Sequence, residues 1–226
     1  MFGRQKVATL VAEFLGTGVL TLLILSVQRS TIGVPFFVAM TAGLTLALMV
    51  FVLSNKHSAN LNPAVTIGLW TARKIPTLTA IAYVAVQLLG AWAAYYLYIY
   101  FVRNSLQPIG GHFAARVLVA EATGTAILTF GWAAAIYRKA NAVGIAATAG
   151  LAYMIGIIAA SPAAIGLLNP AVSLGVRAWV WGTYVLGPVI GGIIGVNLYA
   201  LLFTESGGAL GEALANANKS NGKSKK

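Results

Sequence analysis

The sequence predicts an all-α membrane protein with six transmembrane helices and two half helices, arranged as two inverted repeats. Three observations lead to this prediction: a very apolar composition, six apolar runs of membrane-spanning length, and two pairs of short motifs that recur at nearly one spacing. Hydrophobic residues make up 59% of the 226 residues and charged residues only 8%, whereas a soluble domain carries roughly 25% charged residues. The composition therefore excludes a soluble enzyme, a disordered regulator and a free DNA-binding protein.

Six apolar runs reach the length of about 20 residues that a helix needs to cross about 30 Å of hydrocarbon. They lie near residues 7–27, 35–54, 77–102, 115–137, 144–161 and 180–203. Two further apolar runs, near 62–72 and 169–179, are too short, because ten residues of helix rise only about 15 Å. The first run follows a basic start and fits a spanning helix better than the shorter core of a signal peptide.

An internal repeat relates the two halves of the chain. The phrase Val-Ala-Glu-x-x-Gly-Thr occurs around Glu13 and again around Glu121, and Leu-Asn-Pro-Ala-Val begins at Leu61 and again at Leu168. The offset is 108 residues for the glutamates and 107 for the second phrase. Each half holds three spans, and because three is odd, the second half inserts upside down relative to the first.

This repeat sets the expected domain organisation. We expect one channel domain over residues 1–205, with repeats at about 5–104 and 113–205, followed by a basic, disordered cytoplasmic tail over 206–226.

The net charge of +11 fits a membrane topology better than nucleic-acid binding, because the basic residues punctuate apolar runs instead of gathering on one surface. With both termini on one side, eleven of the fifteen Lys and Arg residues fall on that side. The other four are Arg29, Arg103, Arg116 and Arg177. The bias predicts cytoplasmic termini, and a plasma membrane is the default location.

Each Asn-Pro-Ala triplet predicts the start of a half helix, because asparagine is a favoured N-cap and proline is suited to the first helical position. The residues are Asn62, Pro63, Ala64, Asn169, Pro170 and Ala171. Inversion brings the two positive helix ends together near the midplane. There the asparagine amides can donate hydrogen bonds to a passing solute, while cations and protons meet an electrostatic barrier. The segments 57–61 and 164–168 cannot be helical at this depth, so their carbonyls would line the same path.

These residues resemble the aquaporin or major intrinsic protein family over about residues 5–203, since paired Asn-Pro-Ala boxes in two inverted halves are highly specific to it. The phrases that begin at Gln87 (Gln-Leu-Leu-Gly-Ala) and at Gly187 (Gly-Pro-Val-Ile-Gly) are also similar to the family. The resemblance implies an aquaporin-like fold and a passive channel for water or small neutral solutes. It also implies a homotetramer with one pore per subunit.

The selectivity filter that the resemblance implies is unusual. Family members that select water tightly carry arginine after the second Asn-Pro-Ala, where this chain has Val172; the family's spacing puts the other filter positions at Ala42, Ile157 and Gly166. These four residues would form a wide, apolar filter with no side-chain charge or donor, similar to some plant vacuolar members that conduct water, urea, ammonia and hydrogen peroxide. Ser173 stands where glycerol facilitators usually carry aspartate.

Glu13 and Glu121 are the only acids within the spans, and an intramembrane acid raises the hypothesis of a proton relay. The resemblance implies instead a buried structural role, in which each carboxylate accepts N–H bonds from the loop before an Asn-Pro-Ala. No span offers a histidine or basic partner for a relay. His57 either hydrogen-bonds within its loop or gates the pore by protonation.

Arg177 lies eight residues past Asn169, about 12 Å along a continuous half helix. We interpret it as a C-terminal helix charge that faces the surface, and not as a substitute for the missing filter arginine. Four tyrosines near the end of a span predict an interfacial aromatic belt: Tyr95, Tyr96, Tyr98 and Tyr100.

The predicted function is a passive channel for water and small uncharged solutes of the glycerol, urea, ammonia or hydrogen peroxide class. Its expected partners are these solutes, membrane lipid and its own copies, with no cofactor, metal site or nucleic acid. The alternative is an ion-coupled secondary transporter, which also uses inverted repeats and broken helices. An ion channel is disfavoured because the pore lacks charged rings, and an enzyme because the chain has two histidines, no cysteine and no aspartate.

Since the chain contains no cysteine, mercurials have no thiolate to bind. We expect mercuric chloride to leave the osmotic water flux of proteoliposomes unchanged in stopped-flow light scattering. Strong mercurial block of this flux would contradict the prediction.

Overall fold

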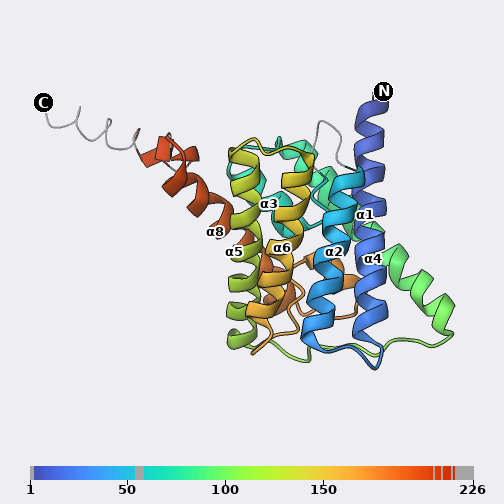
Figure 1. Ribbon diagram of the computed structural model, residues 1–226. Coiled ribbons are helices and arrows are strands. Elements are labelled where there is room, and N and C mark those ends of the chain that lie inside the picture. The colour runs from blue at the N-terminus through green and yellow to red at the C-terminus, as the bar shows by residue number, and fades with distance from the viewer. Residues whose placement is uncertain (1–2, 54–58, 206, 210, 215, 217–226) are drawn as a thin grey trace, which may run out of the picture.

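The computed structural model describes residues 3–53, 59–205, 207–209, 211–214 and 216. Figure 1 shows a bundle of long helices. They are α1 (Arg4–Gln28), α2 (Pro35–Leu53), α4 (Thr77–Val102), α5 (Ala115–Tyr137), α6 (Ala142–Ala160) and α8 (Leu186–Phe203). Two short helices, α3 (Pro63–Thr71) and α7 (Pro170–Gly175), complete the repeats, and a π-helical turn, η1 (Trp181–Val185), leads into α8. The six long helices are apolar and long enough to cross a membrane, which confirms the predicted fold class.

Equivalent helices of the two repeats make equivalent contacts. Helix α1 packs against α4, and α5 packs against α8 in the same way, while α2 and α6 pack against each other across the repeat interface. Each half helix also contacts a long helix of the other repeat: α3 packs against α8 and α7 against α4. The repeats are therefore interlocked, and α1, α2, α6 and α5 stand side by side in Figure 1.

Glycines allow the close approach of α2 and α6. A Cβ atom on Gly43 would lie 2.7 Å from the carbonyl oxygen of Gly150 and 2.9 Å from Cβ of Met154. Without a strong hydrophobic drive between helices in lipid, small residues that let backbones approach are a main source of packing energy. Gly18 of α1 and Gly90 of α4 make a similar contact within the first repeat.

The second half helix is shorter than expected, because α7 ends at Gly175 and not near residue 179. Arg177 adopts the left-handed conformation with φ of 65°, and its N–H donates to the carbonyl oxygen of Leu174 at 3.2 Å. The N–H of Ala178 donates to the carbonyl oxygen of Ser173 at 2.9 Å. These two bonds form a Schellman motif, which closes the helix without glycine.

The start of another helix also differs from the prediction. Helix α6 begins at Ala142, two residues early, because the side chain of Asn141 caps it by accepting the N–H of Gly144 at 2.8 Å. In the tail, residues 211–214 are helical, and Glu212 pairs with Arg73 at 3.6 Å. Residues 217–226 lie outside the described residues.

The α2–α6 contact predicts the effect of enlarging Gly43. We expect Gly43→Val to lower the thermal unfolding midpoint in detergent by about 5 °C, because overpacking of a tight contact costs roughly 1–3 kcal/mol. Gly3→Val is the matched control, since no atom lies within 4 Å of a Cβ at that position. An equal midpoint for both variants would contradict the close-packed interface.

Candidate functional site

The two Asn-Pro-Ala triplets begin the two half helices. Asn62 is the N-cap of α3, and its Oδ1 accepts the N–H of Ala64 at 2.8 Å. Asn169 is the N-cap of α7, and its Oδ1 accepts the N–H groups of Ala171 at 3.0 Å and Val172 at 3.3 Å. Each amide oxygen is therefore used to close a helix end, and the amide nitrogen points elsewhere.

Each asparagine also bonds to the loop of the other repeat. Nδ2 of Asn62 donates to the carbonyl oxygen of Leu168 at 2.9 Å, and Nδ2 of Asn169 donates to the carbonyl oxygen of Leu61 at 2.9 Å. These reciprocal bonds hold the two half-helix N-termini against each other. A primary amide carries two N–H donors, so each asparagine retains a second donor beyond its bond to the opposite loop.

The two leucines that accept these bonds have the same unusual backbone. Leu61 has φ of 54° and Leu168 has φ of 52°, in the left-handed region that non-glycine residues rarely adopt. Both side chains are fully buried. Such a conformation costs on the order of 1–3 kcal/mol and persists only when the surroundings determine it.

Glu121 helps to fix the backbone around Leu168 in the second repeat. Its Oε1 accepts the N–H groups of Gly166 at 2.9 Å and Leu167 at 3.1 Å, and its Oε2 accepts that of Leu168 at 2.8 Å. The residue is fully buried. One carboxylate thus satisfies three consecutive backbone donors in a segment that has no helix of its own. Tyr153 of α6 donates its hydroxyl to the carbonyl oxygen of Leu167 at 2.8 Å.

Glu13 makes the corresponding contacts in the first repeat. It accepts the N–H groups of Asn60 and Leu61, each at 2.7 Å, and also Nε2 of Gln87 at 2.7 Å. Nε2 of Gln87 lies 3.0 Å from Oγ1 of Thr66, which also accepts Nδ2 of Asn60 at 3.1 Å. The third donor to Glu13 is therefore the side chain of Gln87 on α4, whereas all three donors to Glu121 are backbone N–H groups.

A glycine one turn after each glutamate makes room for the strained leucine. A Cβ on Gly16 would lie within 3 Å of the side chain of Leu61, and a Cβ on Gly124 would lie 2.7 Å from that of Leu168. The sequence reasoning named the repeated phrases but missed these glycines and leucines. The signal was present, because Glu-x-x-Gly and Leu-Asn-Pro-Ala occur in both halves.

The four predicted filter positions come from four segments. Ala42 lies on α2, Ile157 near the end of α6, Gly166 in the loop before α7 and Val172 on α7. Gly166 contacts Ile157, since a Cβ on the glycine would lie 3.1 Å from Cγ2 of Ile157. Ala42, Ile157 and Val172 are fully buried and belong to one apolar cluster.

Three other predictions concern Arg177, the cluster of tyrosines and His57. Arg177 does not simply face the surface: it is half-buried, and its Nη1 donates to the hydroxyl of Tyr95 at 3.2 Å. The early end of α7 explains the error, because Arg177 lies beyond the helix. Of the four clustered tyrosines, Tyr96 is exposed but Tyr98 is buried, so they do not form one belt. His57 lies outside the described residues.

Comparison with known proteins identifies the family. The model of the major intrinsic protein family matches residues 4–199. This chain belongs to the major intrinsic protein family. The relatives include Aquaporin Z of Photorhabdus laumondii, which is 30% identical over 87% of this chain and 97% of its own. A probable aquaporin TIP-type of Medicago truncatula is 32% identical over 71% of this chain and 69% of its own.

The fold of this major intrinsic protein is also that of a solved channel. The X-ray structure of the aquaglyceroporin from Plasmodium falciparum superposes with a TM-score of 0.68, covering 86% of this chain and 93% of the other at 22% identity. The chain is therefore an integral membrane channel of the aquaporin type for water and small solutes, and not an enzyme.

The contacts of Glu121 predict that a neutral amide cannot replace it. Glutamine offers one acceptor oxygen and turns an NH₂ group toward backbone donors, which costs about 1–3 kcal/mol for each donor left unsatisfied. We expect Glu121→Gln to lower the thermal unfolding midpoint by several degrees and to reduce water flux per folded protein.

Glu212→Gln is the matched control, because Glu212 is exposed and its ion pair with Arg73 is a surface pair of little energetic value. A Glu121→Gln variant as stable as the wild type would contradict the structural role. Loss of proton-driven flux without loss of stability would favour a proton relay.

Proposed function

We propose that this protein is a passive channel that conducts water and small uncharged solutes, of the glycerol, urea, ammonia or hydrogen peroxide class, through a wide apolar filter. The filter residues in this proposal are Ala42, Ile157, Gly166 and Val172. The gradient of each solute alone drives its flux, and the paired half-helix N-termini exclude ions.

The observation that carries the proposal is the nature of Val172. It is fully buried, three residues past the N-cap Asn169, at the position where tight water channels of the family carry arginine. Its side chain offers no hydrogen bond, and its backbone N–H already donates to Oδ1 of Asn169. A water molecule passing Val172 therefore gains no donor from this residue, whereas the carbon skeleton of a larger solute gains apolar contact.

Gly166 supports the same interpretation. Its φ of 75° favours glycine, and an added Cβ would crowd Ile157, since it would lie 3.0 Å from the carbonyl oxygen of that residue. Any larger residue here would project toward the face of Ile157. The glycine thus avoids this crowding and adds no side chain to the proposed filter.

Ion exclusion in this proposal rests on Asn62 and Asn169. Their helices, α3 and α7, present positive dipole ends to one another, and each amide keeps a second N–H for a solute oxygen. A neutral solute can accept these bonds, whereas a cation would lose its hydration and meet positive potential. The hydrogen bonds that hold the amides do not involve the side chain of Val172, so ion exclusion and solute size are set by different side chains.

We further propose a homotetramer in the plasma membrane with both termini in the cytoplasm. The orientation is supported by the charge distribution, because eleven basic residues fall on the side of the termini and four on the other. The tetramer follows from the family resemblance. Each subunit would contain its own pore, since both half helices belong to one chain.

The second candidate function is an ion-coupled secondary transporter. It would use the same inverted repeats and discontinuous helices, but it requires alternating access. Its flux would saturate with solute and depend on an ion gradient. Flux through the proposed channel would instead rise linearly with the solute gradient and would not respond to Na⁺ or proton gradients.

The sharpest test is Val172→Arg in proteoliposomes, with stopped-flow light scattering under an impermeant osmolyte and then under glycerol or urea. The wild type is expected to conduct both water and solute. The arginine should cut solute flux at least about tenfold, which corresponds to about 1.4 kcal/mol of added barrier, and reduce water flux less.

The matched control is Val34→Arg, because Val34 is an exposed valine in the loop between α1 and α2. It adds the same side chain away from the proposed filter and should leave both fluxes unchanged. Fast water flux with no solute flux in the wild type would refute the wide filter. Saturable, ion-dependent flux would favour the transporter.

A further inference from the structure

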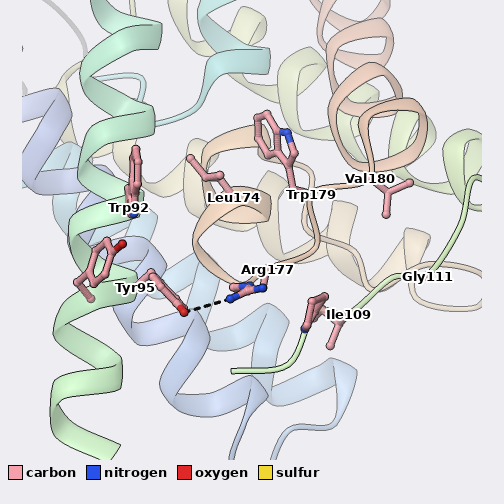
Figure 2. Close-up of a pocket in the computed structure, with 10 residues that line it drawn as sticks. Trp92, Tyr95, Ile109, Gly111, Leu174, Arg177, Trp179 and Val180 are labelled. Carbon is pink, nitrogen blue, oxygen red and sulfur yellow. Dashed lines mark hydrogen bonds between the residues drawn. The ribbon is translucent and has the colours of Figure 1, made fainter. Parts of the chain in front are cut away.

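A cavity of about 600 Å³ is lined by residues that belong neither to the proposed filter nor to the Asn-Pro-Ala triplets. Helix α4, the loop before α5, the end of α7 and the segment after it line the cavity, with Trp92, Tyr95, Leu174, Arg177 and Trp179 among its residues (Figure 2). This volume lies within the range of roughly 300–1,000 Å³ that is typical of small-molecule sites.

Arg177 provides the charge of this cavity. Figure 2 shows its guanidinium in the middle of the lining residues, bonded to the hydroxyl of Tyr95. The backbone carbonyl oxygen of Arg177 accepts the N–H of Ile109 at 2.9 Å, which fixes the loop beside it. A guanidinium carries five N–H donors in a planar fork, and the bond to Tyr95 uses only one of them.

Among the residues that the structure describes, no carboxylate pairs with Arg177. Its four acidic residues are Glu13, Glu121, Glu205 and Glu212. The first two are buried against the loops before the half helices, and the last two follow α8 on the side of the termini. Within the part of the chain that the structure describes, the ion pair is that of Glu212 with Arg73. A second copy of this chain would bring no carboxylate to this face either.

The walls of the cavity carry exposed, amphipathic aromatic rings. Trp92 is 50% exposed, Tyr96 is 55% exposed and Trp179 is 41% exposed. Amphipathic aromatic rings gather at the membrane–water interface. Leu89, one turn before Trp92 toward the membrane centre, is also exposed, so α4 offers an apolar surface that continues from the cavity into the hydrocarbon.

We propose that this cavity binds the headgroup of an anionic phospholipid from the leaflet opposite the termini, with its phosphate on Arg177 and its acyl chain along α4. Arginine recognises phosphate through two parallel N–H bonds, and the hydroxyl of Tyr95 lies beside it. A zwitterionic headgroup fits less well, because its ammonium group would lie near Arg177 without a carboxylate to accept it. None of the lining residues belongs to the proposed filter or to the Asn-Pro-Ala triplets, so the proposal does not depend on which solute passes.

The test is native mass spectrometry of the detergent-purified protein titrated with phosphatidylglycerol and, separately, with phosphatidylcholine. The wild type should bind phosphatidylglycerol more tightly. Arg177→Gln should weaken that binding at least about tenfold, as expected for the loss of a charged hydrogen-bond donor, and Arg177→Lys should weaken it less.

Arg103→Gln is the matched control. Arg103 is exposed at the end of α4 and, like Arg177, has a left-handed backbone, with φ of 52°, so this variant removes the same charge from the same side in the same conformation. It should bind phosphatidylglycerol like the wild type. Arg177→Lys keeps the charge, so it still tests the proposal if Arg177→Gln fails to fold.

Four results would overturn the proposal. Equal loss in Arg103→Gln would mean nonspecific attraction of anionic lipid. Equal binding of phosphatidylcholine would mean that the site does not select an anion. Displacement of the lipid by soluble glycerol phosphate would mean a site for free anions. A change of oligomeric mass in Arg177→Gln would mean that the cavity is a contact between subunits.

Discussion

The whole structure depends on satisfying the backbone of two non-helical segments in the middle of the bundle. In hydrocarbon an unbonded N–H or C=O costs several kcal/mol, so irregular backbone survives there only with partners inside the protein. Glu13 and Glu121 provide these partners for the N–H groups of the loops. A carboxylate has more acceptor positions than any neutral side chain of its size, which explains why a charged residue type is tolerated at this depth.

Because the repeats are inverted, the hydrogen bonds of the two loops join into one network, which we call the pore frame. The carbonyl oxygens of Leu61 and Leu168 point to the opposite repeat, where Asn169 and Asn62 donate to them. Each asparagine caps its own half helix with Oδ1, and its Nδ2 points to the opposite loop and donates to the carbonyl there. One repeat alone would leave both the carbonyl and the amide unpaired. The two halves therefore form one cooperative unit, and two copies of the same phrases within one chain are needed to build it.

The sequence alone predicted the six spans, the half helices and the inverted pair, which follow from composition, periodicity and repetition. It did not predict features that depend on backbone conformation at ordinary residues. Nothing in the residue type of Arg177 signals a left-handed helix end, because glycine is the residue expected there. The cavity was missed for another reason: α4, the loop at Ile109 and the end of α7 are far apart in sequence, and only tertiary packing brings them together.

The proposed filter is positioned by this frame, but its side chains are not part of the hydrogen-bond network. Ala42, Ile157 and Val172 offer side chains that make no polar contact, and Gly166 contributes its N–H to Glu121 and no side chain to the pore. Exchanging such side chains leaves the bonds of Glu13, Glu121 and the two asparagines intact. Substitutions that change solute selectivity therefore have little effect on the stability of this fold. Substitutions of the glutamates or asparagines remove hydrogen-bond partners that hydrocarbon cannot replace. The same argument explains how a chain without the filter arginine keeps the complete paired Asn-Pro-Ala geometry.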